Sequence, residues 1–142
     1  MKYLLDTNII SEIIAKKPNQ QAIDFINNIN ANAIYLSVIT IGEIKYGINR
    51  LPKSKRKTQL QAWFEQLLIK YQSNIIDIDI SVMAIWADIS SSLKSNGISL
   101  SIMDSLIASS ALYHDMILVT RNTKDFQYIA NLNIINPFKG QL

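Results

Sequence analysis

The chain has 142 residues, 49% of them hydrophobic, and a formal net charge of +3. This length and composition predict one globular domain over residues 1–142, built around a single core. Because there is no cysteine and only one histidine, His114, disulfides, thiolate metal sites and multi-histidine zinc sites are excluded. The sequence contains no run of 18 apolar residues of the kind that predicts a membrane span. The acid at position 6 comes too early for a signal peptide. We therefore expect a cytoplasmic protein with no membrane partner.

Apolar residues at strand or helix spacing, separated by proline, glycine and asparagine, predict five strands and seven helices. The strands are expected over residues 2–6, 34–37, 74–79, 116–120 and 132–136. The helices are expected over residues 7–16, 19–30, 38–49, 54–71, 81–94, 101–114 and 123–131. This alternation predicts an α/β fold with a central, mostly parallel sheet and helices on both faces.

Four of the eleven acidic residues stand where apolar segments end or helices begin. Asp6 closes the first strand, Asp125 follows the fourth by a short turn, and Glu43 and Asp104 lie near the starts of helices. Sites in parallel sheets form at the carboxyl ends of the strands, so all four face one rim if the first and fourth strands are neighbours. Converging carboxylates repel one another unless a cation lies between them, and oxygen donors favour Mg²⁺ or Mn²⁺.

Other roles for these acids remain open at this point. Asp6 can cap the helix that follows it, and Asp104 and Asp125 can be first-turn acids that the helix dipole favours. The protein would then be a catalytically inactive α/β binding module. A phosphatase or receiver-like α/β protein with an acidic Mg²⁺ site is a further alternative, in which Asp77 or Asp79 would follow a middle strand.

The positive charge is concentrated in one run. Without it the chain holds nine basic against eleven acidic residues, so the body is slightly acidic. Such a run suits an anionic partner, although a solvated helix start explains it equally well. The run consists of Arg50, Lys53, Lys55, Arg56 and Lys57.

Four segments resemble the motifs of the PIN-domain ribonucleases, and among them the VapC-type toxins of bacterial toxin–antitoxin pairs. The resemblance runs from Lys2 to about Pro137. The chain departs from the family at Ser101, where proline is frequent, and at Ser109 and Ser110, where Ala-Thr is frequent. The matching segments are Leu4-Leu5-Asp6-Thr7-Asn8-Ile9-Ile10-Ser11, Leu36-Ser37-Val38-Ile39-Thr40-Ile41-Gly42-Glu43, Met103-Asp104-Ser105-Leu106-Ile107-Ala108 and Leu118-Val119-Thr120-Arg121-Asn122-Thr123-Lys124-Asp125-Phe126.

The resemblance implies a Mg²⁺- or Mn²⁺-dependent endoribonuclease that hydrolyses RNA phosphodiesters and is inhibited by a cognate antitoxin protein. It implies that Asp6, Glu43, Asp104 and Asp125 are the catalytic acids. We predict that Asp6 and Asp104 ligate the metal directly. Glu43 and Asp125 would ligate through water, complete a second ion site or orient the attacking water. Neutral hydrogen bonds at the rim are expected from Asn8, Ser37, Thr40 and Asn122.

Two expectations concern partners. The family usually forms homodimers, and the apolar faces of the helices near 19–30 and 54–71 are candidate contacts for a second copy or the antitoxin. The basic run at 50–57 is a candidate RNA-binding surface.

Overall fold

The structure is a computed structural model that describes residues 1–139. Its sheet has five parallel strands in the order β3-β2-β1-β4-β5, so β1 is central and β4 is its neighbour. The predicted α/β fold and parallel sheet are therefore confirmed. The strands are β1 (Tyr3–Leu5), β2 (Ile34–Ser37), β3 (Ile75–Ile76), β4 (Ile117–Val119) and β5 (Ile134–Ile135).

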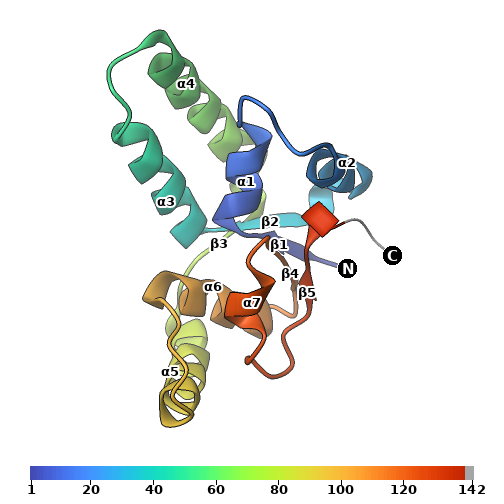
Figure 1. Cartoon of the computed structure of the whole chain (residues 1–142), viewed down its shortest axis with the longest axis vertical. Helices are drawn as coiled ribbons and strands as arrows, with labels where there is room; N and C mark the ends of the chain where they lie inside the picture. The colour runs from blue at the N-terminus through green and yellow to red at the C-terminus, as the bar shows by residue number, and fades with distance from the viewer. Residues whose placement is uncertain (140–142) are drawn as a thin grey trace.

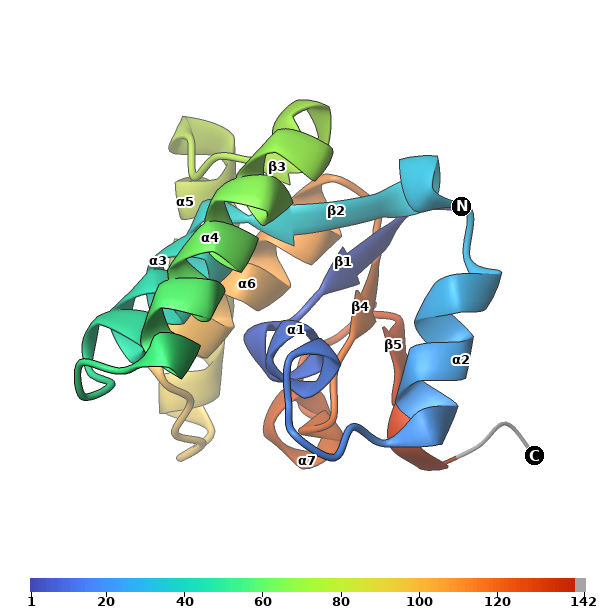
Figure 2. The same cartoon turned by 90° about the horizontal axis from the view of Figure 1, so that it is seen from above.

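Helices cover both faces of this sheet. Figure 1 shows α1 to α4 above the sheet and α5 to α7 below it, and Figure 2 shows α3 and α4 side by side at one end with α2 at the other. The α-helices are α1 (Thr7–Ile13), α2 (Gln20–Asn28), α3 (Val38–Asn49), α4 (Lys55–Lys70), α5 (Ile80–Ser95), α6 (Ile102–Tyr113) and α7 (Thr123–Phe126). Short 3₁₀ turns are η1 (Ala31–Ala33), η2 (Gln72–Asn74) and η3 (Pro137–Lys139).

The sheet separates two hydrophobic cores. Successive side chains of a strand point to opposite faces, so Leu5 and Val119 pack under α1 to α4 while Leu4 and Leu118 pack against α5 to α7. All four of these side chains are fully buried. Because both faces are covered, the strands need continuous apolar sequence, as observed.

Most of the predicted elements are longer in the sequence pattern than in the fold, and three show why. The helix expected over 7–16 ends at Ile13, and the one expected over 123–131 ends at Phe126. The strand expected over 74–79 keeps only Ile75 and Ile76, and Asp79 at its expected end instead caps α5 by accepting a hydrogen bond from Val82 N. Apolar residues continue past each of these ends, but tertiary contacts and caps stop the element.

The apolar faces of α2 and α4 are turned largely toward the core. Phe25 and Ile26 of α2 pack on the same core as Leu60, Phe64 and Leu67 of α4. A contact of these helices with a second copy or the antitoxin stays a prediction, because helical periodicity identifies an apolar face without saying what covers it. Large apolar side chains that stay exposed lie on α3, α4, α5 and α6 and just after α7, and include Tyr46, Ile69, Ile80, Met83, Ile102, Met103, Tyr113 and Tyr128.

Within residues 1–139, no helix combines the length and the apolar character needed to cross a bilayer.

Candidate active site

Asp6 stands at the carboxyl end of the central strand, where its side chain is almost fully buried. Its Oδ1 accepts a hydrogen bond from Thr7 N at 2.8 Å, which caps α1. Its Oδ2 accepts from Thr120 Oγ1 at 2.8 Å and from Asn8 Nδ2 at 3.1 Å. The same carboxylate therefore caps a helix and borders the rim of the sheet, so the two roles considered for it are compatible.

The turn after β4 is tied to the turn after β1. Thr120 Oγ1 accepts hydrogen bonds from Asn122 N at 3.1 Å and Asn8 Nδ2 at 3.3 Å. Arg121 N donates to Asn8 Oδ1 at 3.1 Å. These bonds fix two segments that are far apart in sequence into one polar rim beside Asp6.

Glu43 projects from α3 toward the start of α1. Thr7 Oγ1 donates to Glu43 Oε1 at 2.6 Å and lies 3.2 Å from Thr40 Oγ1. Thr40 is therefore a supporting residue behind the acid. Ser37 is buried, and its hydroxyl accepts a hydrogen bond from Ile39 N at the start of α3. It caps the helix that carries Glu43 and is not among the residues that line the hollow beside Asp6.

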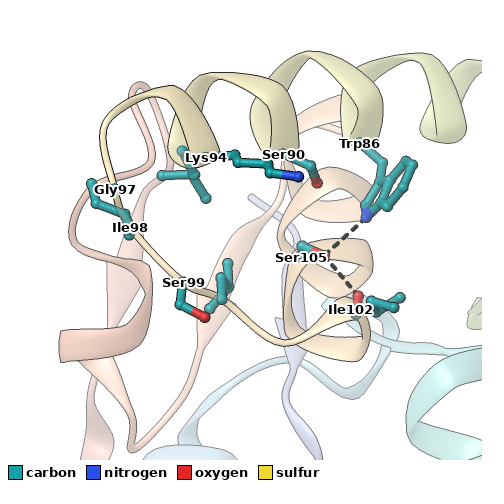
Figure 3. A pocket seen from close by; sticks show the side chains of 10 residues that line it. Trp86, Ser90, Lys94, Gly97, Ile98, Ser99, Ile102 and Ser105 are labelled. Atoms are coloured by element: carbon teal, nitrogen blue, oxygen red, sulfur yellow. Dashed lines mark hydrogen bonds between the residues drawn. The ribbon is translucent and has the colours of Figure 1, made fainter.

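Asp104 lies in the first turn of α6, where it is partly buried. Ser101, at the position where the family often has proline, caps this helix by accepting a hydrogen bond from Asp104 N at 3.1 Å. On the other side of α6, Trp86 Nε1 of α5 donates to Ser105 Oγ at 2.9 Å, and that hydroxyl donates to the carbonyl of Ile102. Figure 3 shows this link in a hollow of about 440 Å³ between the two helices.

The pKa values of two acids show that the carboxylates converge. Burial raises the pKa of Asp6 above its ordinary value, hydrogen bonds from Thr120 and Thr7 lower it, and repulsion from Asp104 and Glu43 raises it further. Burial also raises the pKa of Asp104, the hydrogen bond with Ser101 lowers it, and repulsion from Asp125 and Glu43 adds to the increase. Each of the four acids is thus close enough to repel another.

The acids border an open hollow of about 430 Å³. Asp6, Glu43 and Asp104 all line it, while Asp125 is exposed on α7 and lies outside its lining, within repulsive range of Asp104. The lining residues are Asp6, Thr7, Asn8, Ser11, Glu12, Glu43, Asp104, Arg121 and Asn122.

Several of these residues were not identified as site residues from the sequence. Thr7 and Thr120 directly follow strands, yet a hydroxyl there is as common in an ordinary turn as in a site. Glu12 accepts a hydrogen bond from Asn19 N at 2.6 Å and holds the loop between α1 and α2. Ser11 and Arg121 also line the hollow, and the position of Arg121 directly after the fourth strand was the available signal.

The chemistry of the hollow suits a hard divalent cation. Its donors are carboxylate, amide and hydroxyl oxygens, the ligands that Mg²⁺ and Mn²⁺ prefer. A cation would also relieve the mutual repulsion of the acids. Within residues 1–139, however, no three acidic or histidine side chains are drawn together closely enough to enclose an ion.

The basic run lies at the turn between α3 and α4, at the far end of α3 from the strand rim (Figure 1). Arg56 donates to the carbonyl of Ile14 at 2.9 Å, and Lys57 Nζ donates to two carbonyls of the turn. Arg50 lies over the ring of Tyr46, 5.7 Å from its centroid. These contacts stabilise the turn, and an RNA-binding role for the run stays a prediction.

The receiver-like alternative has no support in this arrangement. Its candidate acids, Asp77 and Asp79, follow β3 at the edge of the sheet, and Asp79 caps α5. Neither lines the hollow beside Asp6.

Comparison with known proteins places this arrangement in a family. The PIN domain family matches residues 3–132. Toxin FitB of Neisseria gonorrhoeae is 33% identical over 95% of this chain and 97% of its own length. VapC ribonuclease Y4jK of Sinorhizobium fredii is 31% identical over 96% of this chain and 97% of its own length.

Solved structures agree with these relatives. A FitAB complex bound to a DNA fragment contains a chain with a TM-score of 0.93 and 33% identity, matched over 99% of this chain and 98% of that one. VapBC2 of Rickettsia felis, bound to a DNA fragment from its promoter, gives a TM-score of 0.80 with 31% identity over 96% and 98% of the two chains. The predicted resemblance is confirmed, and the chain belongs to the PIN-domain family, among its VapC-type toxins.

Proposed function

We propose that this protein is a metal-dependent endoribonuclease that serves as the toxin of a toxin–antitoxin pair. The observation that carries the proposal is the convergence of Asp6, Glu43 and Asp104 on one hollow at the carboxyl ends of the central strands. Relatives support the substrate class, since one is named a VapC ribonuclease and another, 26% identical and from Shigella flexneri, a tRNA(fMet)-specific endonuclease.

The electrostatics of the hollow support a requirement for a metal ion. A bare cluster of carboxylates repels both a phosphodiester and hydroxide. Asp6 and Asp104 would hold Mg²⁺ or Mn²⁺, which supplies a water of lowered pKa and stabilises negative charge on the attacked phosphate. The buried hydrogen bonds from Thr120 and Asn8 keep the Asp6 carboxylate in one orientation.

The remaining polar residues fit supporting roles. Glu43, held by the Thr7 hydroxyl, faces the hollow and can accept a proton from the attacking water. Asp125 stands at the outer edge, where it can orient a water molecule or complete a second ion site. Asn122 lines the hollow and offers a neutral amide to the substrate.

Helix capping alone does not explain this set of acids. Asp6 does cap α1, and Asp104 lies in a first turn. Glu43 caps neither end of α3, whose N-cap is Ser37, and its carboxylate accepts a hydrogen bond from Thr7 of another helix. A binding module that used its acids only as caps would have no reason to keep a carboxylate there.

A cognate antitoxin is the proposed regulator, and cytoplasmic RNA the proposed target. Several solved relatives are complexes named for both a toxin and its partner, and some of these include DNA. A homodimer remains a prediction of the family resemblance, and light scattering of the purified chain with and without its antitoxin measures it.

The test is cleavage of a labelled single-stranded RNA by the purified chain. We expect cleavage with Mg²⁺ or Mn²⁺, none in EDTA, and a loss of about a hundredfold or more in Asp104→Asn, because that change removes a ligand charge. Asp24→Asn, an exposed acid of α2, is the matched control and should cleave as the unchanged chain does. Activity that ignores EDTA, or survives in Asp104→Asn with its fold intact, would contradict the proposal.

A further inference from the structure

Arg121 is the one basic residue among those that line the acidic hollow. It lies two residues beyond the end of β4 and is exposed. Its neighbours around the hollow include the carboxylates of Asp6, Glu12, Glu43 and Asp104. A lone guanidinium in such surroundings needs an explanation, because the simplest acidic site for a cation would exclude a fixed positive charge.

The backbone of Arg121 is held on both sides. Its N–H donates to Asn8 Oδ1 at 3.1 Å, and the Nδ2 of the same amide donates to Asp6 Oδ2 at 3.1 Å. Its carbonyl accepts from Asn136 Nδ2 at 3.4 Å, beyond the end of β5. Asn8 therefore fixes Asp6 and the Arg121 backbone with one side chain, so the carboxylate and the base of the arginine keep a constant spacing.

The guanidinium is also oriented. It lies over the ring of Phe138, 4.8 Å from the centroid, and Phe138 packs against the core under α1 to α4. A cation over an aromatic ring uses one face of its plane. The N–H groups at the edge of the guanidinium stay available, and their planar fork matches the oxygens of a phosphate.

We propose that Arg121 binds a backbone phosphate of the RNA at the mouth of the hollow and that Phe138 positions it there. This inference rests on the proposed function and adds a substrate contact to it. A phosphodiester that approaches four acids meets repulsion, and one oriented guanidinium at the entrance offsets it for a polyanion that enters from the β4 side. Arg121 makes no covalent step and transfers no proton.

The experiment compares cleavage of a single-stranded RNA by the unchanged chain, Arg121→Gln, Arg121→Lys and Phe138→Leu, over a series of salt concentrations. For Arg121→Gln we expect kcat/KM to fall by about tenfold to a hundredfold, the range for one charge-assisted hydrogen bond, mostly through KM. The slope of log kcat/KM against log salt should become shallower by about 0.7, the value for one phosphate contact on a single strand.

The other two variants separate charge from orientation. Arg121→Lys keeps the charge, so its salt slope should match the unchanged chain while kcat/KM falls through loss of the planar fork. Phe138→Leu should likewise keep the salt slope and raise KM, because the Arg121 charge remains but its guanidinium is no longer oriented by the aromatic ring. Thermal unfolding of each variant checks that the fold persists.

Lys70→Gln is the matched control. Lys70 is an exposed cation that lies over an aromatic ring, 5.4 Å from the centroid of Tyr71, at the end of α4 and outside the hollow. If Arg121→Gln and Lys70→Gln change KM and the salt slope equally, the inference is wrong although the nuclease assignment stands. If the unchanged chain cleaves no RNA with either metal, the proposed function fails and this inference fails with it.

Discussion

At the scale of single residues, Asp6 combines a structural and a chemical role in one buried carboxylate. Three hydrogen bonds satisfy its oxygens, yet burial and the neighbouring acids still raise its pKa. Its charge is therefore costly in the absence of a cation. A buried carboxylate that lowers folding stability at the carboxyl end of a central strand indicates a functional site.

This cost predicts how stability depends on pH. The folded-state pKa of Asp6 lies above its ordinary value of 3.8, so the folded chain binds a proton more tightly than the unfolded chain. Stability from this group is complete below that ordinary value and is lost as pH rises through the raised pKa. In EDTA, the unfolding free energy of the unchanged chain should therefore fall relative to that of Asp6→Asn between acid and neutral pH.

Denaturant unfolding of both proteins across this pH range measures the difference. Parallel stability curves would show that the Asp6 pKa is not raised in the folded state.

The sequence predicted the acids of the site better than the residues that hold them. Asp6 and Glu43 are conspicuous because each carboxylate interrupts an apolar setting. Thr120 is not, since its partner Asp6 is 114 residues away and only the pairing of β1 with β4 brings them together. Threonine is common in ordinary turns, so the sequence alone does not indicate that its hydroxyl contacts so distant a residue.

At the scale of elements, helix caps decide where the acids stand. Ser101 caps α6 through the backbone N–H of Asp104, and Asp79 caps α5 through the N–H of Val82, the equivalent position three residues into the helix. The two caps are alike in geometry, but only the first belongs to a helix whose first turn borders the hollow.

Removing each cap therefore separates stability from activity. Ser101→Ala and Asp79→Ala should each lower the unfolding free energy by about 1 kcal/mol, the usual value for an N-cap. Activity per folded molecule should fall in Ser101→Ala, because the first turn of α6 frays and Asp104 moves, and should stay unchanged in Asp79→Ala. Denaturation curves combined with RNA cleavage under folding conditions give both quantities, and equal activity in the two variants would refute the role assigned to Ser101.

Hydrophobic periodicity predicted the type and order of the helices and strands, but not the residues at which several of them end. Ile75, Ile76 and Ile78 suggested a strand over 74–79, but β3 stops at Ile76 and Asp79 serves as the cap of α5. Similarly, Ile129 is buried beyond the end of α7 without being helical. Burial and secondary structure are separate properties, and periodicity reports the first more faithfully.

At the scale of the whole molecule, the charge pattern predicts how a metal affects stability. A cation that binds only the folded hollow stabilises it by mass action, about 2.7 kcal/mol when its concentration is a hundred times its dissociation constant. We expect Mg²⁺ to raise the thermal midpoint of the unchanged chain and to have much less effect on Asp6→Asn or Asp104→Asn. Calorimetry at matched ionic strength, with a monovalent salt as control, measures this. Equal shifts in all three proteins would place the ion elsewhere.

The arrangement of the whole chain was predictable because strands and helices alternate and parallel strands share one functional edge. The location of the basic run was not, since it depends on α3 carrying the chain away from that edge before α4 returns. Over the seven residues from Glu43 to Arg50 the helix rises about 10 Å. The five charges are thus held apart from the acids, and three of them stabilise the turn.

The pairing of the first strand with the fourth also governs when the protein becomes active during its own synthesis. Asp6 leaves the ribosome 114 residues before Thr120, and its backbone N–H pairs with the carbonyl of Val119 at the end of β4. Until β4 emerges, Asp6 lacks its contacts with Val119 and Thr120, and the hollow that Asp104 lines is incomplete. A growing chain therefore carries the acids without the site, and the ribosome that translates it meets an assembled nuclease only when nearly the whole chain has been released.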